Sequence, residues 1–460
     1  AVSFDVCRAV PRAQREGALA LGASRWQTIW SVVLLYARPG IIGGCFIALG
    51  RAIGETMAVT MLIGNRTYFP WPLWTATPFD LGNSIASVIA NEFTAASYDL
   101  YLSALVELGL VLLLVSVVVN TLARLLIWRV SQVGRGTAFF GGRLGIWRKN
   151  RSVTAASTPV PIETSNNTPP SSQGRPRVAN RKAQRIDRVM TAVLGLCLAL
   201  TVVPLFLILG HLLYHGITAL DWDFFTKLPV AIGEKGGGMA NAIYGSAMLV
   251  GLATLFAVPV GLAAAIYLAE YRSDRLGPTV RFIGELLGGV PSIVIGIFAY
   301  TLVVIPMGHP SGWAGGFALG VMMIPIVMRA SEEALKLVPQ AIRNASYALG
   351  ASQYQTVLRV IVPAALPAII TAVFLGIARI AGETAPLLLT AVGNRYWPRS
   401  PNDWVPSLPV YIFNYAVSAD AEWNRQAWAA ALVLLVAVMI LNFGIRLVTG
   451  RRVVSAGRAD

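Results

Sequence analysis

The sequence predicts an all-α membrane protein, a polytopic helix bundle with about eight transmembrane helices. Of its 460 residues, 55% are hydrophobic and 13% are charged, whereas soluble domains carry about a quarter of charged residues. Mean hydropathy is +0.63. Apolar runs of about 20 residues, the length that crosses a bilayer as a helix, recur along the chain. These observations together indicate a surface that faces lipid.

We expect spanning helices over residues 40–64, 104–128, 187–210, 242–268, 283–306, 313–330, 366–392 and 428–449. No charged stretch followed by an apolar run opens the sequence, so we expect no signal peptide there. The segment 131–186 differs from the rest, because it is rich in Ser, Thr, Pro, Asn and Arg. With so few large apolar residues it cannot bury a core, and we interpret it as a flexible basic cytoplasmic linker.

The net charge is +15, and the basic residues cluster between the predicted spans. That distribution is typical of cytoplasmic loops of membrane proteins, and it lacks the aromatic-interleaved basic face of a nucleic-acid-binding protein. We therefore expect the lipid bilayer as a partner and no nucleic acid. The linker holds the largest basic group: Arg143, Arg148, Lys149, Arg151, Arg175, Arg177, Arg181, Lys182, Arg185 and Arg188.

No pattern of catalytic or metal-binding residues appears. The three cysteines have no ligand-like spacing, and His211 and His215 have no carboxylate or cysteine companion, so we expect no metal site. No nucleophile–base arrangement indicates an enzyme. The chain also lacks a Gly-x-x-x-x-Gly-Lys-Ser/Thr loop, which excludes ATP hydrolysis by the P-loop route.

An internal repeat is the most informative feature. With a shift of 328 residues, Leu21-Gly22-Ala23-Ser24 aligns with Leu349-Gly350-Ala351-Ser352, and Gly54-Glu55-Thr56 aligns with Gly382-Glu383-Thr384. After a slip of one residue, Gly64-Asn65-Arg66 aligns with Gly393-Asn394-Arg395. Both copies precede a span that leaves the cytoplasm, so the repeat is parallel. We predict a truncated first module with two spans (1–130), the linker (131–186) and a complete second module with six spans (187–460).

Each copy predicts a compact helix–turn–helix on the cytoplasmic face. In the second copy Pro339 suits a first helical turn, Gly350 suits a left-handed residue at a helix end, and Ser352 begins a capping box with Gln355. The first copy has the same signals at Pro11, Gly22, Ser24 and Gln27. A single copy is typical of an ordinary loop. Two copies in matched register favour a docking element for a cytosolic partner.

The candidate site residues are two charged pairs, Arg51/Glu55 and Arg379/Glu383, each spaced i, i+4 in a predicted span. Ionisable residues in spans are costly and usually face the bundle interior or an aqueous path. An arginine offers forked donors to a tetrahedral oxyanion, and the glutamate would hold it or neutralise the path without an anion. The alternative is an ion pair that only joins helices. The order of arginine before glutamate is the weaker one for support within a helix, which favours a pathway.

The glycine-centred loop resembles the coupling-helix signature of ABC importer permeases, Glu-Ala-Ala followed by a Gly at a set spacing. The copies are Glu16-Gly17-Ala18-Leu19-Ala20-Leu21-Gly22 and Asn344-Ala345-Ser346-Tyr347-Ala348-Leu349-Gly350. The wider sequence resembles phosphate-specific permeases of the Pst type, on the segments 51–56, 379–384 and 285–294. The resemblance covers about 180–455 as a complete PstA-like subunit and 1–130 as the C-terminal part of a PstC-like subunit, which suggests a fusion.

The resemblance implies the fold of a type I ABC importer permease that moves inorganic phosphate across the inner membrane. It implies a cytosolic ABC ATPase dimer that binds the ATP and docks on two loops, marked by Glu16, Gly22 and Ser24 and by Asn344, Gly350 and Ser352. It also implies a periplasmic or lipid-anchored phosphate-binding protein.

Two departures from the family pattern lead to further expectations. Asn344 stands where the signature has glutamate, so a charged contact is expected to be absent in that half. The first module begins at its coupling loop, so either the sequence is a fragment or another chain supplies the missing helices. Two alternatives stay open for the function: a permease for another oxyanion, such as sulfate or molybdate, and a membrane carrier or sensor without an ATPase.

Overall fold

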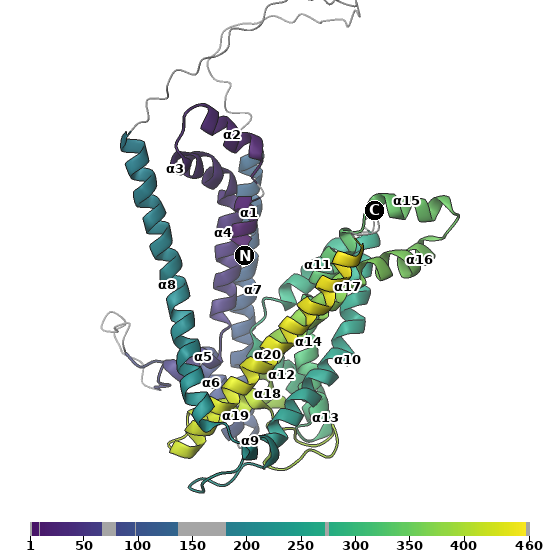
Figure 1. Cartoon of the computed structure of the whole chain (residues 1–460). Coiled ribbons are helices and arrows are strands. Elements are labelled where there is room, and N and C mark those ends of the chain that lie inside the picture. Colours follow the sequence, from purple (N-terminus) through teal and green to yellow (C-terminus); the bar gives the residue numbers. More distant parts are fainter. Residues whose placement is uncertain are drawn as a thin grey trace, which may run out of the picture. The chain divides into compact units, whose positions relative to one another are not determined.

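Figure 1 shows a computed structural model of the chain, which describes residues 2–8, 10–66, 80–96, 98–136, 181–271 and 276–456. For some helical residues only the backbone is described, among them Arg51 and the stretches 123–136, 181–184 and 445–456. Throughout the described ranges the chain forms helices and loops and contains no strand, which confirms the all-α prediction. Most of the predicted linker, residues 137–180, lies outside the described residues.

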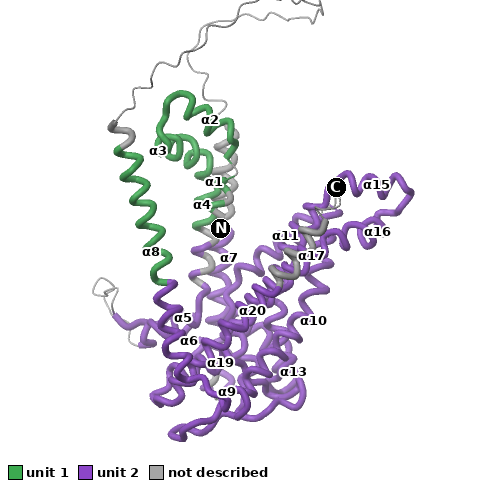
Figure 2. Tube along the Cα trace, viewed as in Figure 1, with its two compact units in different colours: residues 1–45, 123–204 green, residues 46–122, 205–460 purple. Residues whose placement is uncertain are grey.

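The chain divides into two compact units (Figure 2). Unit 1 comprises residues 1–45 and 123–204, and unit 2 comprises 46–122 and 205–460. The unit boundaries fall within three helices: α4 (Leu34–Ile53), α7 (Asp99–Gly136) and α8 (Arg181–Ala219). The predicted modules follow the sequence repeat and not the packing, and they stay a prediction.

Six stretches of helix are long and apolar enough to cross a membrane: Asp99–Leu122, Arg185–Ala219, Ala240–Glu270, Gly312–Lys336, Gln353–Ile380 and Ala421–Gly444. A seventh span results if Leu276–Leu287 and Ser292–Met307, which are bent by 102°, count as one. The predicted spans 40–64 and 366–392 are not single helices. Each contains a break, after Ile53 in α4 and after Ile380 in α17 (Val362–Ile380).

Both predicted spans break at the same repeated motif, Gly-Glu-Thr, because glycine is a poor helix former. The chain resumes as two short helices, α5 (Met57–Leu62) and α18 (Ala385–Thr390). Hydropathy alone does not reveal these breaks, since apolar residues flank the motif on both sides. The repeated motif is therefore a structural boundary within each span.

The helices repeat with the shift that the sequence shows. Four elements recur 328 residues later (Arg12 to Gln340): α2 (Arg12–Ala20), α3 (Arg25–Thr28), η1 (Ile29–Val33) and α5 reappear as α15 (Gln340–Ala348), α16 (Gln353–Thr356), η6 (Val357–Ile361) and α18. Helices α4 and α17 also begin at this offset. Both η1 and η6 are π-helical turns, which are rare and frequent at functional sites.

The remaining helices complete both copies and the bundle of unit 2. They are α1 (Val2–Arg8), α6 (Ile85–Glu92), η3 (Phe93–Ala95), α9 (Trp222–Thr226), α10 (Ala240–Glu270), α11 (Leu276–Leu287), α12 (Ser292–Ala299), η5 (Tyr300–Val304), α13 (Ile305–Met307), α14 (Gly312–Lys336), α19 (Leu408–Ala416) and α20 (Ala421–Ala456).

The main core of unit 2 lies between α10, α14 and α17, where Leu249, Met323 and Ile380 are fully buried. Glycines on α14 allow close packing: a Cβ at Gly316 would lie 2.7 Å from the Cβ of Leu252. Such small residues let helix backbones approach each other in membrane proteins. This close packing fixes the ends of α14 and α17, and those ends carry the candidate site.

Two glycines on α10 test this packing. A Cβ at Gly245 would lie 2.0 Å from the carbonyl oxygen of Pro406, whereas Gly251 has nothing within 4 Å. We expect Gly245→Ala to destabilise the purified protein by about 1–3 kcal/mol, because the loop at Pro406 must move. Gly251→Ala is the matched control and should unfold like the wild type. Thermal unfolding in detergent measures both, and equal unfolding of the two variants would contradict the close approach.

Candidate functional site

Three helix breaks line one cavity of about 470 Å³ in unit 2. They are residues 54–56 between α4 and α5, 382–384 between α17 and α18, and 288–291 between α11 and α12. The first two are the two copies of Gly-Glu-Thr. Irregular backbone at membrane depth is tolerated where it lines a cavity or is buried in protein. The repeat thus brings its two copies to one site.

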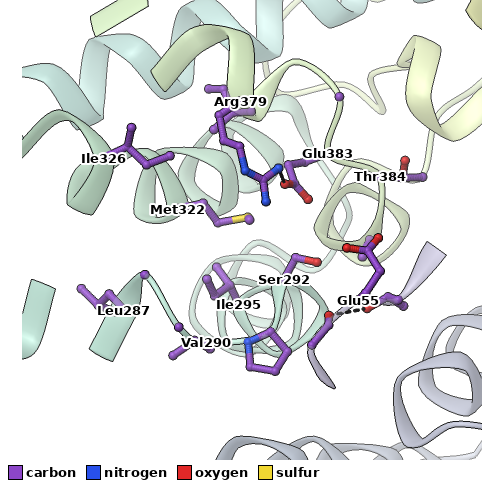
Figure 3. A pocket seen from close by; sticks show the side chains of 18 of the residues that line it. Glu55, Leu287, Val290, Ser292, Ile295, Met322, Ile326, Arg379, Glu383 and Thr384 are labelled. Atoms are coloured by element: carbon purple, nitrogen blue, oxygen red, sulfur yellow. Dashed lines mark hydrogen bonds and ion pairs between the residues drawn. The ribbon is translucent and has the colours of Figure 1, made fainter. Parts of the chain in front are cut away.

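Arg379 and Glu383 form an ion pair at the wall of this cavity (Figure 3). They do not share a helix as predicted, because α17 ends at Ile380 and Glu383 lies in the break. The Glu383 side chain is 11% exposed and that of Arg379 is 41% exposed. The carboxylate is therefore the more deeply held partner, and the guanidinium is the more accessible one.

Glu55 lines the same cavity, and Figure 3 shows its carboxylate facing the side where Ser292 and Glu383 lie. Its predicted partner Arg51 is in α4, but the Arg51 side chain lies outside the described residues. The structure therefore brings three of the four predicted pathway residues, Glu55, Arg379 and Glu383, to one cavity. Hydroxyl groups of Ser292 and Thr384 add polar lining.

Neighbouring groups hold the breaks in place. A Cβ at Gly54 would lie 3.1 Å from the Cα of Pro291, so the first break packs on the third, whereas Gly382 has nothing within 4 Å. The carbonyl oxygen of Gly289 accepts hydrogen bonds from the Ser116 hydroxyl at 2.9 Å and the Asn120 amide at 3.4 Å. Sequence reasoning missed these two α7 residues, because no local pattern links them to residue 289.

The two predicted coupling loops have the predicted backbone geometry. Gly22 and Gly350 have φ of +89° and +81°, the left-handed conformation that glycine favours. The residue after each glycine donates its N–H to the carbonyl five positions back, and the glycine donates to the carbonyl three positions back, a Schellman motif. These bonds are Ala23 to Ala18, Gly22 to Leu19, Ala351 to Ser346 and Gly350 to Tyr347, at 2.9–3.2 Å.

The next helix of each loop starts with a complete capping box, at Ser24 with Gln27 and at Ser352 with Gln355. Leucines beside the glycines face solvent, with Leu21 91% and Leu349 89% exposed. The two signature positions, Glu16 and Asn344, are also exposed. In unit 2, α15 and α16 project from one end of the bundle (Figure 1). Each loop is thus a rigid element with an apolar tip, which suits docking of a partner.

A buried arginine, which sequence reasoning missed, anchors each loop. Arg343 forms an ion pair with Glu270 at the end of α10 and donates to the carbonyl oxygen of Leu335 in α14 at 2.7 Å. Arg15 donates to the carbonyl oxygen of Cys7 in the same way. The shift of 328 residues relates Arg15 to Arg343 and Cys7 to Leu335. The aligned arginines were a usable sequence signal, whereas Glu270 had none.

Within unit 1, α8 also contacts the coupling loop. The Asp187 carboxylate accepts hydrogen bonds from the Ser24 hydroxyl at 2.8 Å and from the Trp26 N–H at 3.0 Å. Asp187 lies near the start of α8 and follows the predicted linker in sequence. The first loop is therefore bonded to the helix that opens the second module.

The outer loop of the second module is ordered by one carboxylate. Asp403 accepts the backbone N–H groups of Ser400 at 2.9 Å and Arg399 at 2.7 Å, and these bonds lower the pKa of the Asp403 carboxyl. Nearby, the Tyr411 hydroxyl donates to the carbonyl of Asn394 at 2.7 Å, and burial raises its pKa. Both groups keep their usual charge state near neutral pH.

The histidines form an aromatic cluster. The rings of His211 and His215 are 4.4 Å apart, and Trp428 lies 5.1 and 5.4 Å from them. Over the ranges that the structure describes, no group of three His, Cys, Asp or Glu residues is placed to hold a metal ion.

The Arg343–Glu270 anchor gives a stability prediction. Arg343→Ala leaves the Glu270 carboxylate buried without its partner, and we expect a loss of about 3–5 kcal/mol. The double variant Glu270→Gln/Arg343→Met should lose less than the sum of the two single variants. Thermal unfolding in detergent is the measurement, with Arg359→Ala, an exposed arginine in η6, as the control. Additive losses would contradict a direct interaction.

Comparison with known proteins agrees with this arrangement. The family model described as "Binding-protein-dependent transport system inner membrane component" matches residues 4–132 and 257–453. One matched segment therefore lies in each of the two repeat copies.

Curated relatives match the second part of the predicted fusion. The phosphate transport system permease protein PstA of Yersinia pestis is 43% identical over 238 residues, covering 52% of this chain and 81% of that protein. The protein of the same name from Haemophilus influenzae is 44% identical, with coverages of 55% and 92%. PstA 1 of Mycobacterium tuberculosis is 34% identical, with coverages of 60% and 93%. Each of these relatives accounts for 52–60% of the chain, and the PstC-like part stays a prediction.

Solved structures with similar chains include a bacterial alginate ABC transporter in complex with its alginate-bound periplasmic protein. The match has 17% identity and a TM-score of 0.44, covering 59% of this chain and 96% of that one. A chain of the MetNI methionine ABC transporter matches with 19% identity and a TM-score of 0.40, covering 46% and 95%.

Proposed function

Because the chain belongs to the family of inner-membrane components of binding-protein-dependent transport systems, we propose that it is the permease of an ATP-driven importer of inorganic phosphate. It is a multi-pass inner-membrane protein and a transport subunit, not an enzyme. The named permease relatives, at 34–44% identity, support phosphate as the substrate.

One observation carries the assignment of the pathway: both copies of Gly-Glu-Thr and the Arg379 guanidinium line a single cavity. A guanidinium presents several N–H donors in a planar fork that fits tetrahedral oxyanions. The ion pair with Glu383 holds Arg379 at the wall. When phosphate enters, Arg379 binds and orients it, and Glu383 keeps the guanidinium in place.

The second module also supports a mechanical route from the cytoplasm to this cavity. One helical stretch runs from Gln353 in the coupling loop to Ile380, one residue beyond Arg379. At a rise of about 1.5 Å per residue, its 28 residues are about 42 Å long. Displacement of the loop by a partner is therefore transmitted along one rigid element. The Arg343 anchor ties the loop to α10 and α14 as well.

The partners follow from this arrangement. A cytosolic ABC ATPase dimer, which binds the ATP, docks on the loops at Gly22 and Gly350, where Leu21 and Leu349 are exposed. A periplasmic or lipid-anchored phosphate-binding protein delivers the anion to the outer segments 65–103 and 393–427.

Helices from a further chain complete the first module. The support is Arg15, whose Nε is buried without a hydrogen-bond partner among the described residues. Its counterpart Arg343 pairs with Glu270, which α10 supplies. A helix that plays the part of α10 for the first module would offer Arg15 an equivalent carboxylate.

Transport of labelled phosphate into proteoliposomes tests the proposal. The vesicles hold the chain with its ATPase, its binding protein and any chain that completes the first module. We expect ATP-dependent uptake, which Arg379→Ala and Arg51→Ala each lower by roughly 10–100-fold, because a hydrogen bond to a charged group is worth about 1.5–3 kcal/mol.

Arg425→Ala is the matched control, since Arg425 pairs with Glu422 and is not among the cavity residues. Assembly of each variant with the ATPase is checked by co-purification. Full uptake by both cavity variants would reduce Arg51 and Arg379 to structural residues. Uptake of a different oxyanion in place of phosphate would overturn the substrate.

A further inference from the structure

We infer that the carboxylates of Glu55 and Glu383 make the cavity selective for oxyanions that carry a proton. Phosphate meets this requirement at neutral pH and sulfate does not. The inference rests on the proposed phosphate pathway and names the residues that decide which oxyanion can occupy it.

The charge of the cavity poses the problem. Among the described residues that line it, Arg379 is the cation and Glu55 and Glu383 are the carboxylates. A cavity for a bare anion would not be expected to hold two negative groups, because like charges at short range in a site with little water repel strongly. Since both glutamates come from the repeated Gly-Glu-Thr motif, the excess of carboxylates is a feature of both copies.

A proton on the substrate resolves the conflict. An ionised carboxylate only accepts hydrogen bonds, so it can bind an oxyanion only through an O–H of that anion. Phosphate at neutral pH carries one or two protons and can donate them to carboxylate oxygens in charge-assisted bonds. Its remaining oxygens accept from the Arg379 guanidinium. Sulfate is fully deprotonated at this pH, and every oxygen it presents is an acceptor.

The other polar groups of the cavity cannot make this distinction. The hydroxyls of Ser292 and Thr384 either donate or accept, so they suit phosphate and sulfate equally. The two carboxylates differ in how they are held. Glu383 is 11% exposed beneath the Arg379 guanidinium, whereas Glu55 is an exposed side chain that lines the open cavity. Glu55 is therefore the acceptor that an entering anion reaches first.

The test measures binding of labelled inorganic phosphate to the permease–ATPase complex in nanodiscs. The binding protein is left out, because its own selectivity would mask that of the permease. Unlabelled arsenate and sulfate compete up to millimolar concentrations. For the wild type we expect arsenate, which is protonated like phosphate, to displace the label and sulfate to leave it bound.

Glu55→Gln and Glu383→Gln replace an obligate acceptor by an amide that also donates. We expect sulfate to displace phosphate from each variant at concentrations lower by roughly tenfold or more. Glu107→Gln, an exposed glutamate on α7 that is not among the cavity residues, is the matched control and should keep the wild-type selectivity. Thermal unfolding of each variant establishes that it is folded.

The outcomes separate the two claims. Phosphate binding with unchanged exclusion of sulfate in folded Glu55→Gln and Glu383→Gln would overturn the selectivity role and leave the phosphate pathway intact. A wild-type complex that binds sulfate as well as phosphate would do the same. A wild-type complex that binds neither phosphate nor arsenate would contradict the proposed function itself.

Discussion

The candidate site depends on one constraint, the satisfaction of backbone groups where spanning helices break. A broken helix frees N–H and C=O groups, and at membrane depth these need partners within the protein. The structure meets this need with side chains close to the breaks: Ser116 and Asn120 bond the Gly289 carbonyl, and the Thr60 hydroxyl donates to the Thr56 carbonyl at 2.7 Å. Because the breaks are held in this way, the polar backbone and the charged side chains can share a cavity.

The same unit joins this cavity to a docking surface. The stretch from Gln353 to Ile380 connects the coupling loop with the break that follows Arg379. Its lower end is stiffened by the capping box at Ser352 and the Schellman motif at Gly350. Its upper end packs at Ile380 in the main core. A transporter needs such a connection, since the energy is released at the cytosolic partner and used at the anion path.

Much of the fold could be predicted from the sequence, because the repeat carries its own internal check. The alignment of Gly22 with Gly350 and of Ser24 with Ser352 predicted two helix ends and two capping boxes, and the structure has all four. These motifs are local, so their backbone geometry follows from neighbouring residues.

What could not be predicted depends on residues far apart in the chain. The pairing of Arg343 with Glu270 joins the coupling loop to a helix end 73 positions earlier, and no spacing rule indicates it. The breaks at Gly54 and Gly382 were also missed, since the apolar runs continue through them. The gathering of both Gly-Glu-Thr copies with residues 288–291 is a consequence of packing, which hydropathy patterns do not contain.

The central claim, that an oxyanion passes through the cavity where the helices break, has a direct test by thiol labelling. Cys7, Cys45 and Cys197 are replaced by serine, and one cysteine is introduced by Ser292→Cys in the cavity wall or by Thr226→Cys on exposed α9. The rate of reaction with a negatively charged methanethiosulfonate reagent is then measured with and without phosphate. We predict that phosphate slows labelling of Ser292→Cys and leaves Thr226→Cys unchanged. Equal rates at Ser292→Cys with and without phosphate would contradict the account.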